Sequence, residues 1–362
     1  MSKRDEHSAR LIQRWLKGSP RGFLYVVYGE LHLSDGHLPN ELEQVGVAPE
    51  DLVLVHQNID QLYFRLSKSG LDLEHEVLAL NSRTFCILNT TPWVKWQSYL
   101  QHLESSFDQE LDGGTEHSDF DSFVELTRWL QRELGVKVRL SGLHFLSANG
   151  EALEKMELFV PKILQERARR FVLGGRSFLI PETSFAYLGR STLNHASSLA
   201  GQWIIHQLGG IQRTLWDMPR DFNKLIWIET LGFFCSKLVN PKRRVETIRD
   251  LKIAVFKGEQ REEILKLCLQ IRQNQIWPNT GVRTRRVRPR RKSSFFEAAK
   301  IMSALYGEQL YRGYRNGHIS RRDVLRWMGT EVDGPSFEVM YLNVMSKTIE
   351  WTVPLASREE RL

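Results

Sequence analysis

The sequence has few of the features that mark exported, disulfide-bonded or membrane-spanning proteins. Its 362 residues include three cysteines, Cys86, Cys235 and Cys268, which stand far apart among apolar neighbours. They indicate reduced core thiols rather than a disulfide framework or a CxxC metal site. No apolar run approaches the roughly 20 residues that a transmembrane helix needs, and the first ten residues lack the apolar segment of an export signal. These absences predict a cytoplasmic protein without a transmembrane segment.

Outside one segment, the chain has no excess of positive charge. The formal net charge is +7. Six arginines and one lysine lie between Arg283 and Lys292, so this run alone equals the net charge. A nucleic-acid patch there would give steeply salt-dependent binding. However, Pro289 interrupts any regular helix, and no aromatic residue is interleaved for base stacking. The run therefore favours a solvated loop between helices, with nucleic acid an unfavoured partner.

Hydropathy patterns divide the chain into an α/β region over residues 1–150 and a mostly helical region over 151–362. The run Phe23–Tyr28 is apolar, β-branched and aromatic throughout, which is typical of a strand buried on both faces. Further strands of the first region are expected at 52–56, 77–80, 84–88 and 136–146, helices at 5–17, 37–44, 60–68, 93–107 and 120–134, and a polar loop at 108–119. The predicted fold class is α/β, a small mixed sheet with flanking helices followed by a mostly helical region.

The second region is expected to consist of helices that end at glycine and proline. We expect helices at 151–173, 191–208, 222–238, 245–256, 261–272, 295–311 and 320–327, with extended segments at 177–180 and 185–188. Ser191, Asn194 and Ser198 form a face that favours close helix packing. His195 and His206 lie about 16 Å apart on the same helix, too far to share one metal ion. We interpret them as separate structural polar groups.

Polar side chains follow the Phe23–Tyr28 run. Gly29 ends the run, and Glu30, His32 and His37 come within the next eight positions. In open α/β sheets, ligands collect just beyond the carboxyl ends of the strands. A carboxylate and two imidazoles at such a place can bind a metal ion, ligate haem or transfer protons. The alternative is a polar strand end that only faces water.

His56 stands at the end of the next predicted strand. It can join the same site when the two strands are neighbours. A core histidine satisfied by one hydrogen bond explains the pattern equally well.

Three segments carry a more specific pattern: YGELHLSDGHLP at 28–39, VHQN at 55–58 and LNTTPWVKWQSYL at 88–100. Together they resemble the ChaN-like haem-binding uptake family of the Tiki/TraB/erythromycin-esterase superfamily. Segments at 175–182, 193–196 and 232–241 are similar, more weakly, to the helical extension of longer bacterial members. The resemblance implies haem binding with tyrosine ligation, for which Tyr63 and Tyr28 are candidates, although Tyr28 also fits a core position.

In the family that the chain resembles, the site is formed by two Gly-x-x-His elements, one in each half of an α/β domain. Gly29-Glu-Leu-His32 matches the second element, and only 28 residues precede it, too few to contain the first. The chain is therefore expected to begin in mid-domain, through a late start, a split gene or loss of the first half. A sheet without its other half exposes an apolar edge. This predicts self-association or binding of a complementary N-terminal fragment.

Three functions follow from these observations. The first is a non-catalytic, ChaN-like protein that binds haem through His32, His37 or Tyr63, or a divalent metal ion through Glu30, His32 and His56. The second is a metal-dependent hydrolase in which Glu30 and His32 are catalytic, although they supply at most two of the ligands such a centre needs. The third is an interaction module formed by the helical region and the arginine run.

Overall fold

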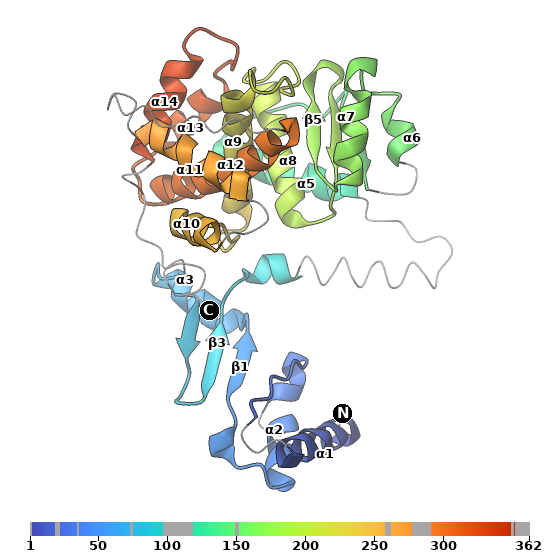
Figure 1. Cartoon of the computed structure of the whole chain (residues 1–362), viewed down its shortest axis with the longest axis vertical. Helices are drawn as coiled ribbons and strands as arrows, with labels where there is room; N and C mark the ends of the chain where they lie inside the picture. Colours follow the sequence, from blue (N-terminus) through green and yellow to red (C-terminus); the bar gives the residue numbers. More distant parts are fainter. Residues whose placement is uncertain are drawn as a thin grey trace. The chain divides into compact units, whose positions relative to one another are not determined.

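A computed structural model of the chain describes residues 2–18, 22–34, 36–72, 75–96, 119–148, 152–257, 262–276, 291–348 and 351. The chain forms two compact units, Met1–Lys95 and Trp96–Leu362 (Figure 1). The fold is mostly helical α/β with two small mixed sheets and a helical C-terminal region, which confirms the predicted fold class. The units divide after Lys95 rather than near residue 150, because residues 119–148 pair and pack within the second unit.

The described residues of the first unit contain one three-stranded sheet, helices α1 to α3 and the first residues of a further helix at 92–95. Its elements are α1 (Ser2–Gly18), η1 (Glu30–Leu33), α2 (Leu38–Gln44), η2 (Pro49–Asp51), β1 (Leu54–Gln57), α3 (Asp60–Lys68), β2 (Val77–Ala79) and β3 (Thr84–Ile87). Strand β3 lies in the centre of the sheet, parallel to β1 and antiparallel to β2. Helices α1 and α2 enclose one hydrophobic cluster, and α3 covers a second cluster with Cys86 of β3 and Leu88, which follows this strand.

The strand predicted at Phe23–Tyr28 is wrong. The segment belongs to no helix or sheet, and Phe23, Tyr25 and Val27 are 86, 74 and 81% exposed. Strand β1 pairs with β3 on one edge, and no strand of the described residues adjoins its other edge. A strand buried on both faces needs neighbours at both edges. The apolar composition predicts such a strand, but the described part of the chain provides no place for it.

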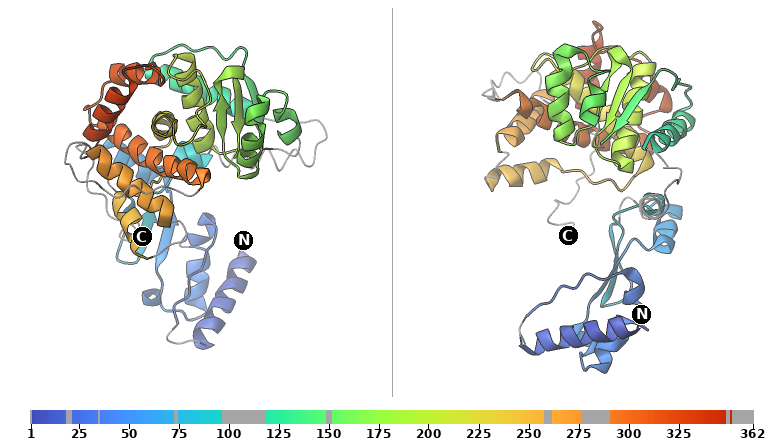
Figure 2. Two further views of the ribbon diagram at one scale, coloured as in Figure 1. Left: turned by 45° about the horizontal axis from the view of Figure 1, so that its top comes forward. Right: turned by 90° about the vertical axis from the view of Figure 1, so that its right-hand side faces the viewer.

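The second unit combines a second mixed sheet with a helical assembly. Its elements are α5 (Asp119–Leu134), β4 (His144–Ser147), α6 (Ala152–Met156), α7 (Lys162–Leu173), β5 (Phe178–Ile180), η3 (Pro181–Thr183), β6 (Phe185–Leu188), α8 (Leu193–Gln207), α9 (Phe222–Val239), α10 (Ile248–Phe256), α11 (Glu262–Ile276), α12 (Lys292–Arg315), α13 (Arg321–Met328) and α14 (Phe337–Lys347). Strand β6 is central, parallel to β4 and antiparallel to β5. The sheet lies at one side of the unit and α11 to α14 lie at the other (Figure 2).

Helix α9 is buried along almost its whole length between α8 and α12. Because both of its sides are covered, its sequence is apolar all round rather than amphipathic. Small residues allow the close contact: a Cβ atom added at Gly232 would lie 2.9 Å from the carbonyl oxygen of Ser198. The serine face of α8 thus packs closely, as its small side chains predict.

Other predictions differ from the structure or lie outside the described residues. The single helix expected at 151–173 is two helices, α6 and α7, because Pro161 interrupts the backbone hydrogen bonding between them. The strand expected at 136–146 covers 144–147 alone, and helix α14 was not anticipated. The loop at 108–119 falls almost wholly outside the described residues. Residues 97–107 of the predicted helix at 93–107 and the arginines up to position 290 also lie outside them.

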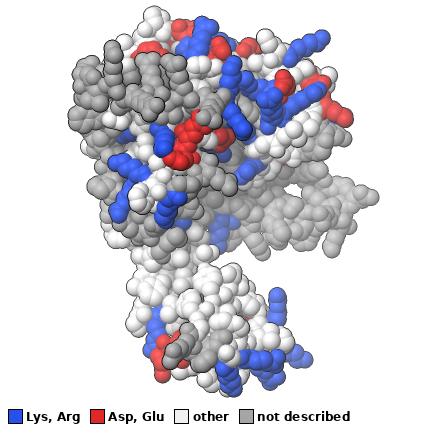
Figure 3. Space-filling view, in the orientation of Figure 1, with Lys and Arg blue, Asp and Glu red and all other residues white. Residues whose placement is uncertain are grey.

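No helix in the described ranges is both long and apolar enough to cross a membrane. On the face shown in Figure 3, the Lys and Arg side chains of the second unit are interspersed with Asp and Glu.

Candidate functional site

Two of the predicted ligands, His32 and His37, share the carboxylate of Asp5 on α1. His32 Nδ1 lies 2.5 Å from Asp5 Oδ1, and His37 Nδ1 lies 3.1 Å from Asp5 Oδ2. The short η1 turn positions His32, and His37 is the residue that precedes α2. Asp5 is fully buried. The structure therefore brings two imidazoles from different turns onto one buried acidic group.

The electrostatics keep Asp5 ionised at neutral pH. Burial raises the pKa of its carboxyl group, but the hydrogen bonds and charges of His32 and His37 outweigh burial and leave the pKa below its ordinary value of 3.8. A carboxylate that accepts a hydrogen bond from Nδ1–H leaves the Nε2 lone pair of an imidazole available to a ligand. Sequence reasoning missed this role of Asp5. The available signal was an acidic residue at the apolar spacing of an amphipathic helix.

Glu30 and His56, also predicted from the sequence, form a second pair. His56 Nδ1 lies 2.8 Å from Glu30 Oε1, and about half of the Glu30 side chain is exposed. In the part of the chain that the structure describes, no group of three or more His, Cys, Asp or Glu side chains is arranged to hold a metal ion. Glu30, His32 and His56 therefore do not converge as one set of metal ligands.

The two tyrosine candidates occupy different environments. The ring of Tyr28 stands edge-on to His32, with centroids 4.8 Å apart, and its hydroxyl oxygen lies 2.6 Å from Ser8 Oγ. Tyr63 is 2% exposed and packs edge-on against Trp93. Its hydroxyl donates to Asp72 at 3.5 Å. A haem iron would reach the Tyr63 oxygen only after this hydrophobic cluster had opened.

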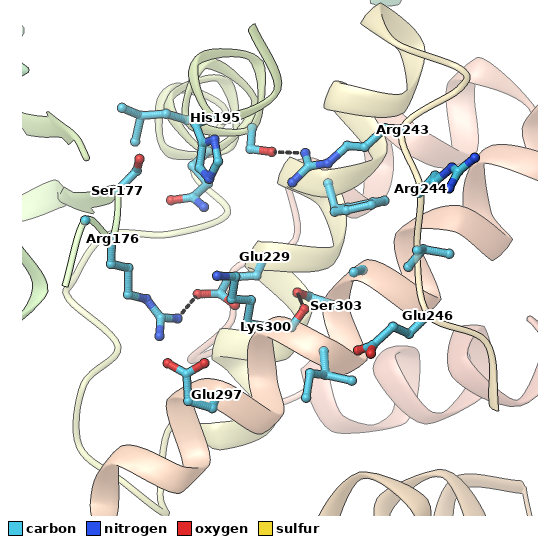
Figure 4. A pocket seen from close by; sticks show the side chains of 18 of the residues that line it. Arg176, Ser177, His195, Glu229, Arg243, Arg244, Glu246, Glu297, Lys300 and Ser303 are labelled. Atoms are coloured by element: carbon cyan, nitrogen blue, oxygen red, sulfur yellow. Dashed lines mark hydrogen bonds and ion pairs between the residues drawn. The ribbon is translucent and has the colours of Figure 1, made fainter. Parts of the chain in front are cut away.

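The second unit contains a pocket of about 510 Å³ that sequence reasoning did not find (Figure 4). The loop after α7, helices α8, α9, α11 and α12, and residues 243–246 contribute to its lining. Four cationic and three acidic side chains lie on its walls, and one of each, Arg176 and Glu229, form an ion pair at 2.5 Å. The pocket assembles from segments far apart in the sequence, so no local motif marks it.

Arg243 is the most constrained cation of this pocket. Its Nη1 donates to the carbonyl oxygen of Asn194 at 3.1 Å, to Ser198 Oγ at 2.8 Å and to Ser236 Oγ. The guanidinium carbon lies 4.1 Å from the centroid of the Phe233 ring. Burial lowers the pKa of Arg243 to about 10, so the group remains charged at neutral pH.

The pKa of His195 responds to the positive charges around the pocket. Burial, together with the positive charges of Arg243, Lys300 and Arg190, lowers this pKa to about 4. The ring is therefore neutral at pH 7, and its Nδ1 lies 2.7 Å from the hydroxyl oxygen of Thr192, the residue that caps α8. His206 instead contacts the carbonyl of Ile211 at 2.9 Å. The two histidines make separate polar contacts, as predicted.

Comparisons of the chain with protein-family models, with curated proteins and with solved structures gave no match. The resemblance to ChaN-like proteins thus stays a prediction carried by the sequence segments named above. What each site does has to be inferred from its own geometry.

Proposed function

We propose that the first unit is a non-catalytic, ChaN-like binding module for haem, with His32 and His37 as the ligand-presenting residues. The observation that carries this proposal is the buried carboxylate of Asp5, which contacts Nδ1 of both imidazoles. This contact orients the rings and leaves Nε2 of each for iron.

The number of nearby ligands favours haem over a hydrolytic metal ion. A catalytic zinc site needs about three protein ligands and an open position, whereas haem iron needs one or two axial side chains. The two imidazoles that contact Asp5 are enough for the axial positions of haem. The described residues offer no cluster of three ligands for a catalytic metal ion. A divalent metal ion held by Glu30, His32 and His56 requires these side chains to move together on binding. Bound haem would supply a redox-active iron centre.

Haem titration followed by absorbance tests the proposal. Wild-type protein is expected to give a saturable Soret shift. His32→Ala should weaken binding by about tenfold or more, because it removes a ligand, and Asp5→Asn by about tenfold, because it releases the orientation of the rings. His7→Ala is the matched control, since His7 is an exposed histidine on α1 that makes none of these contacts.

Each other outcome is informative. A Soret shift that survives His32→Ala but is lost in Tyr63→Phe would transfer the ligand role to the tyrosine. Absence of any shift would reject haem. Stoichiometric zinc or manganese retained by the purified protein, and lost in His32→Ala, would support the metal-binding alternative instead.

We also propose that the first unit associates with a second copy of itself through the apolar segment Phe23–Tyr28 and the open edge of β1. The support is the exposure of Phe23, Tyr25 and Val27 in a segment that belongs to no sheet, together with the edge of β1 that no described strand pairs. Exposed strand edges with apolar side chains recruit further strands. A second copy supplies the same segment, which makes it the simplest partner.

Size-exclusion chromatography with light scattering is expected to show concentration-dependent dimers of the full chain. Val27→Lys should shift the equilibrium to monomer, because it places a charge on the strand that would pair. Ile163→Lys is the control, an equally exposed apolar residue at 91% exposure on α7. A wild-type monomer at high concentration that instead captures a separately expressed complementary fragment would replace self-association with that partner. A monomer that captures nothing would reject both.

A further inference from the structure

The pocket of the second unit has the size and wall chemistry of a small-molecule site. Its volume of about 510 Å³ lies within the range of about 300–1,000 Å³ in which such sites usually fall. Part of the wall is apolar, formed by Leu199, Phe233, Ile264 and Ile301. The remaining wall carries the charged side chains described above. A ligand that fills this space must therefore combine an apolar body with a polar head.

Arg243 leaves one edge of its guanidinium available to such a head. A guanidinium has five N–H donors, and the bonds that Arg243 makes within the described residues all start from Nη1. Its Nε and Nη2 donate to no described residue, while the side chain lines the pocket. The contact with Phe233 and the three oxygen acceptors fix the plane of the group. A fixed Nε–Nη2 edge matches two oxygens of a carboxylate or a phosphate.

The surrounding charges favour an anion at this end of the pocket. The hydrogen-bonding acceptors of Arg243 within the described ranges are neutral oxygens, so its charge is not cancelled by a carboxylate there. Arg176, by contrast, is neutralised by Glu229. Arg243 and Lys300 both line the pocket, and after burial it is their positive charges, with that of Arg190, that lower the pKa of the neighbouring His195.

Two of the three acidic side chains of the pocket lie away from its Arg243 end, and the third, Glu229, forms the ion pair with Arg176. In Figure 4, Glu297 lies at the opposite end from His195 and Arg243, and Glu246 is also away from His195. The pocket is therefore polarised rather than uniformly charged. An oxyanion at the Arg243 end does not have to approach either carboxylate.

We propose that this pocket binds a small organic anion, whose carboxylate or phosphate head takes the free edge of Arg243 and whose apolar body lies against Leu199 and Ile301. Lys300 on α12 supplies a second positive charge to the head. An inorganic anion alone would leave most of the volume unfilled and the apolar wall unused. This site belongs to the second unit and is independent of the function proposed for the first.

Calorimetric titration of the full chain with phenyl phosphate and with benzoate tests the site and identifies the preferred head. Saturable one-to-one binding is expected for at least one of them at low salt. Lys300→Gln should weaken it by about tenfold, the usual effect of losing one charge-assisted contact. Arg243→Lys should weaken it by at least as much, because lysine keeps the charge but lacks the two-donor edge.

Two controls separate the proposal from simpler explanations. Lys292→Gln removes an exposed lysine from the start of the same helix, outside the pocket, and should leave binding unchanged. Benzyl alcohol has the same apolar body without the charge and should bind at least tenfold more weakly.

Several results would contradict the proposal that this pocket binds an organic anion. Equal binding of inorganic phosphate, equal binding of benzyl alcohol, or equal weakening by Lys292→Gln would each show that the pocket does not select an organic anion. Absence of binding by both probes would do the same. Arg243 also has packing contacts, so its variant can fail to fold; Lys300→Gln alone then decides, because Lys300 is exposed.

Discussion

Replacement of Glu308 by glutamine is expected to lower the free energy of unfolding of the second unit by about 3–5 kcal/mol. Glu308 Oε2 lies 2.7 Å from Lys237 Nζ, and Glu308 Oε1 accepts a hydrogen bond from Arg312 Nε at 2.7 Å. Lys237 and Glu308 are both buried. Burial raises the pKa of Glu308, but Lys237 and Arg312 overcome this and lower it, so the carboxylate is charged. The glutamine variant leaves the Lys237 ammonium buried without its counter-charge.

Urea unfolding followed by tryptophan fluorescence measures the effect. The double variant Lys237→Met with Glu308→Leu should recover most of the loss, because it removes both buried charges together. Glu166→Gln, which breaks the exposed ion pair with Arg170, should change the unfolding free energy by less than about 0.5 kcal/mol. A loss below about 1 kcal/mol in Glu308→Gln would mean that the pair is solvated in solution.

The same ion pair connects stability to the anion pocket. Lys237 Nζ also donates to the carbonyl oxygens of Pro241 and Arg243, directly after α9. These bonds hold the turn from which the Arg243 side chain enters the pocket. We therefore expect the Lys237–Glu308 ion pair to hold Arg243 in position. This role explains why the fold retains two buried charges that apolar side chains would replace at little cost in stability.

Elements whose evidence is local could be predicted from the sequence. Helix α3 spans the predicted residues 60–68, and β2 and β3 form the predicted hairpin. In both cases, the periodicity and turn residues within one short segment are sufficient to predict the element. The strongly apolar sequence of α9 likewise predicts this helix without knowledge of its neighbours.

The segment Phe23–Tyr28 shows the limit of such evidence. Its composition is that of a buried strand, but burial depends on a partner at each edge, which composition does not supply. The candidate sites show the same limit. Glu30, His32 and His37 could be named because they follow one another in sequence, whereas Asp5 contacts His32 across 27 positions. Arg243 meets Ser198 across 45 positions, so its pocket is visible in the fold alone.

Close packing between α8 and α9 leads to the second large effect, which is expected for Gly201→Val. A Cβ atom at Gly201 would lie 2.7 Å from Cys235 Cβ, 2.8 Å from its Sγ and 3.2 Å from the Cα of Gly232. These distances are too short for van der Waals contact, and the backbone of Gly232 cannot rotate away as a side chain can. The helices must therefore separate. Overpacking of this kind costs about 3 kcal/mol, which should appear in urea unfolding as a lower midpoint.

A double-variant cycle assigns this loss to the contact itself. Cys235→Gly removes both the Cβ and the Sγ that the new side chain would meet, so Gly201→Val should cost less in that background than in the wild type. Gln207→Val, at the exposed end of the same helix, measures the cost of a β-branched residue in α8 without a helix contact and should remain below about 1 kcal/mol. Equal losses for Gly201→Val in both backgrounds would show that helix propensity, rather than the spacing of α8 and α9, fixes glycine at position 201.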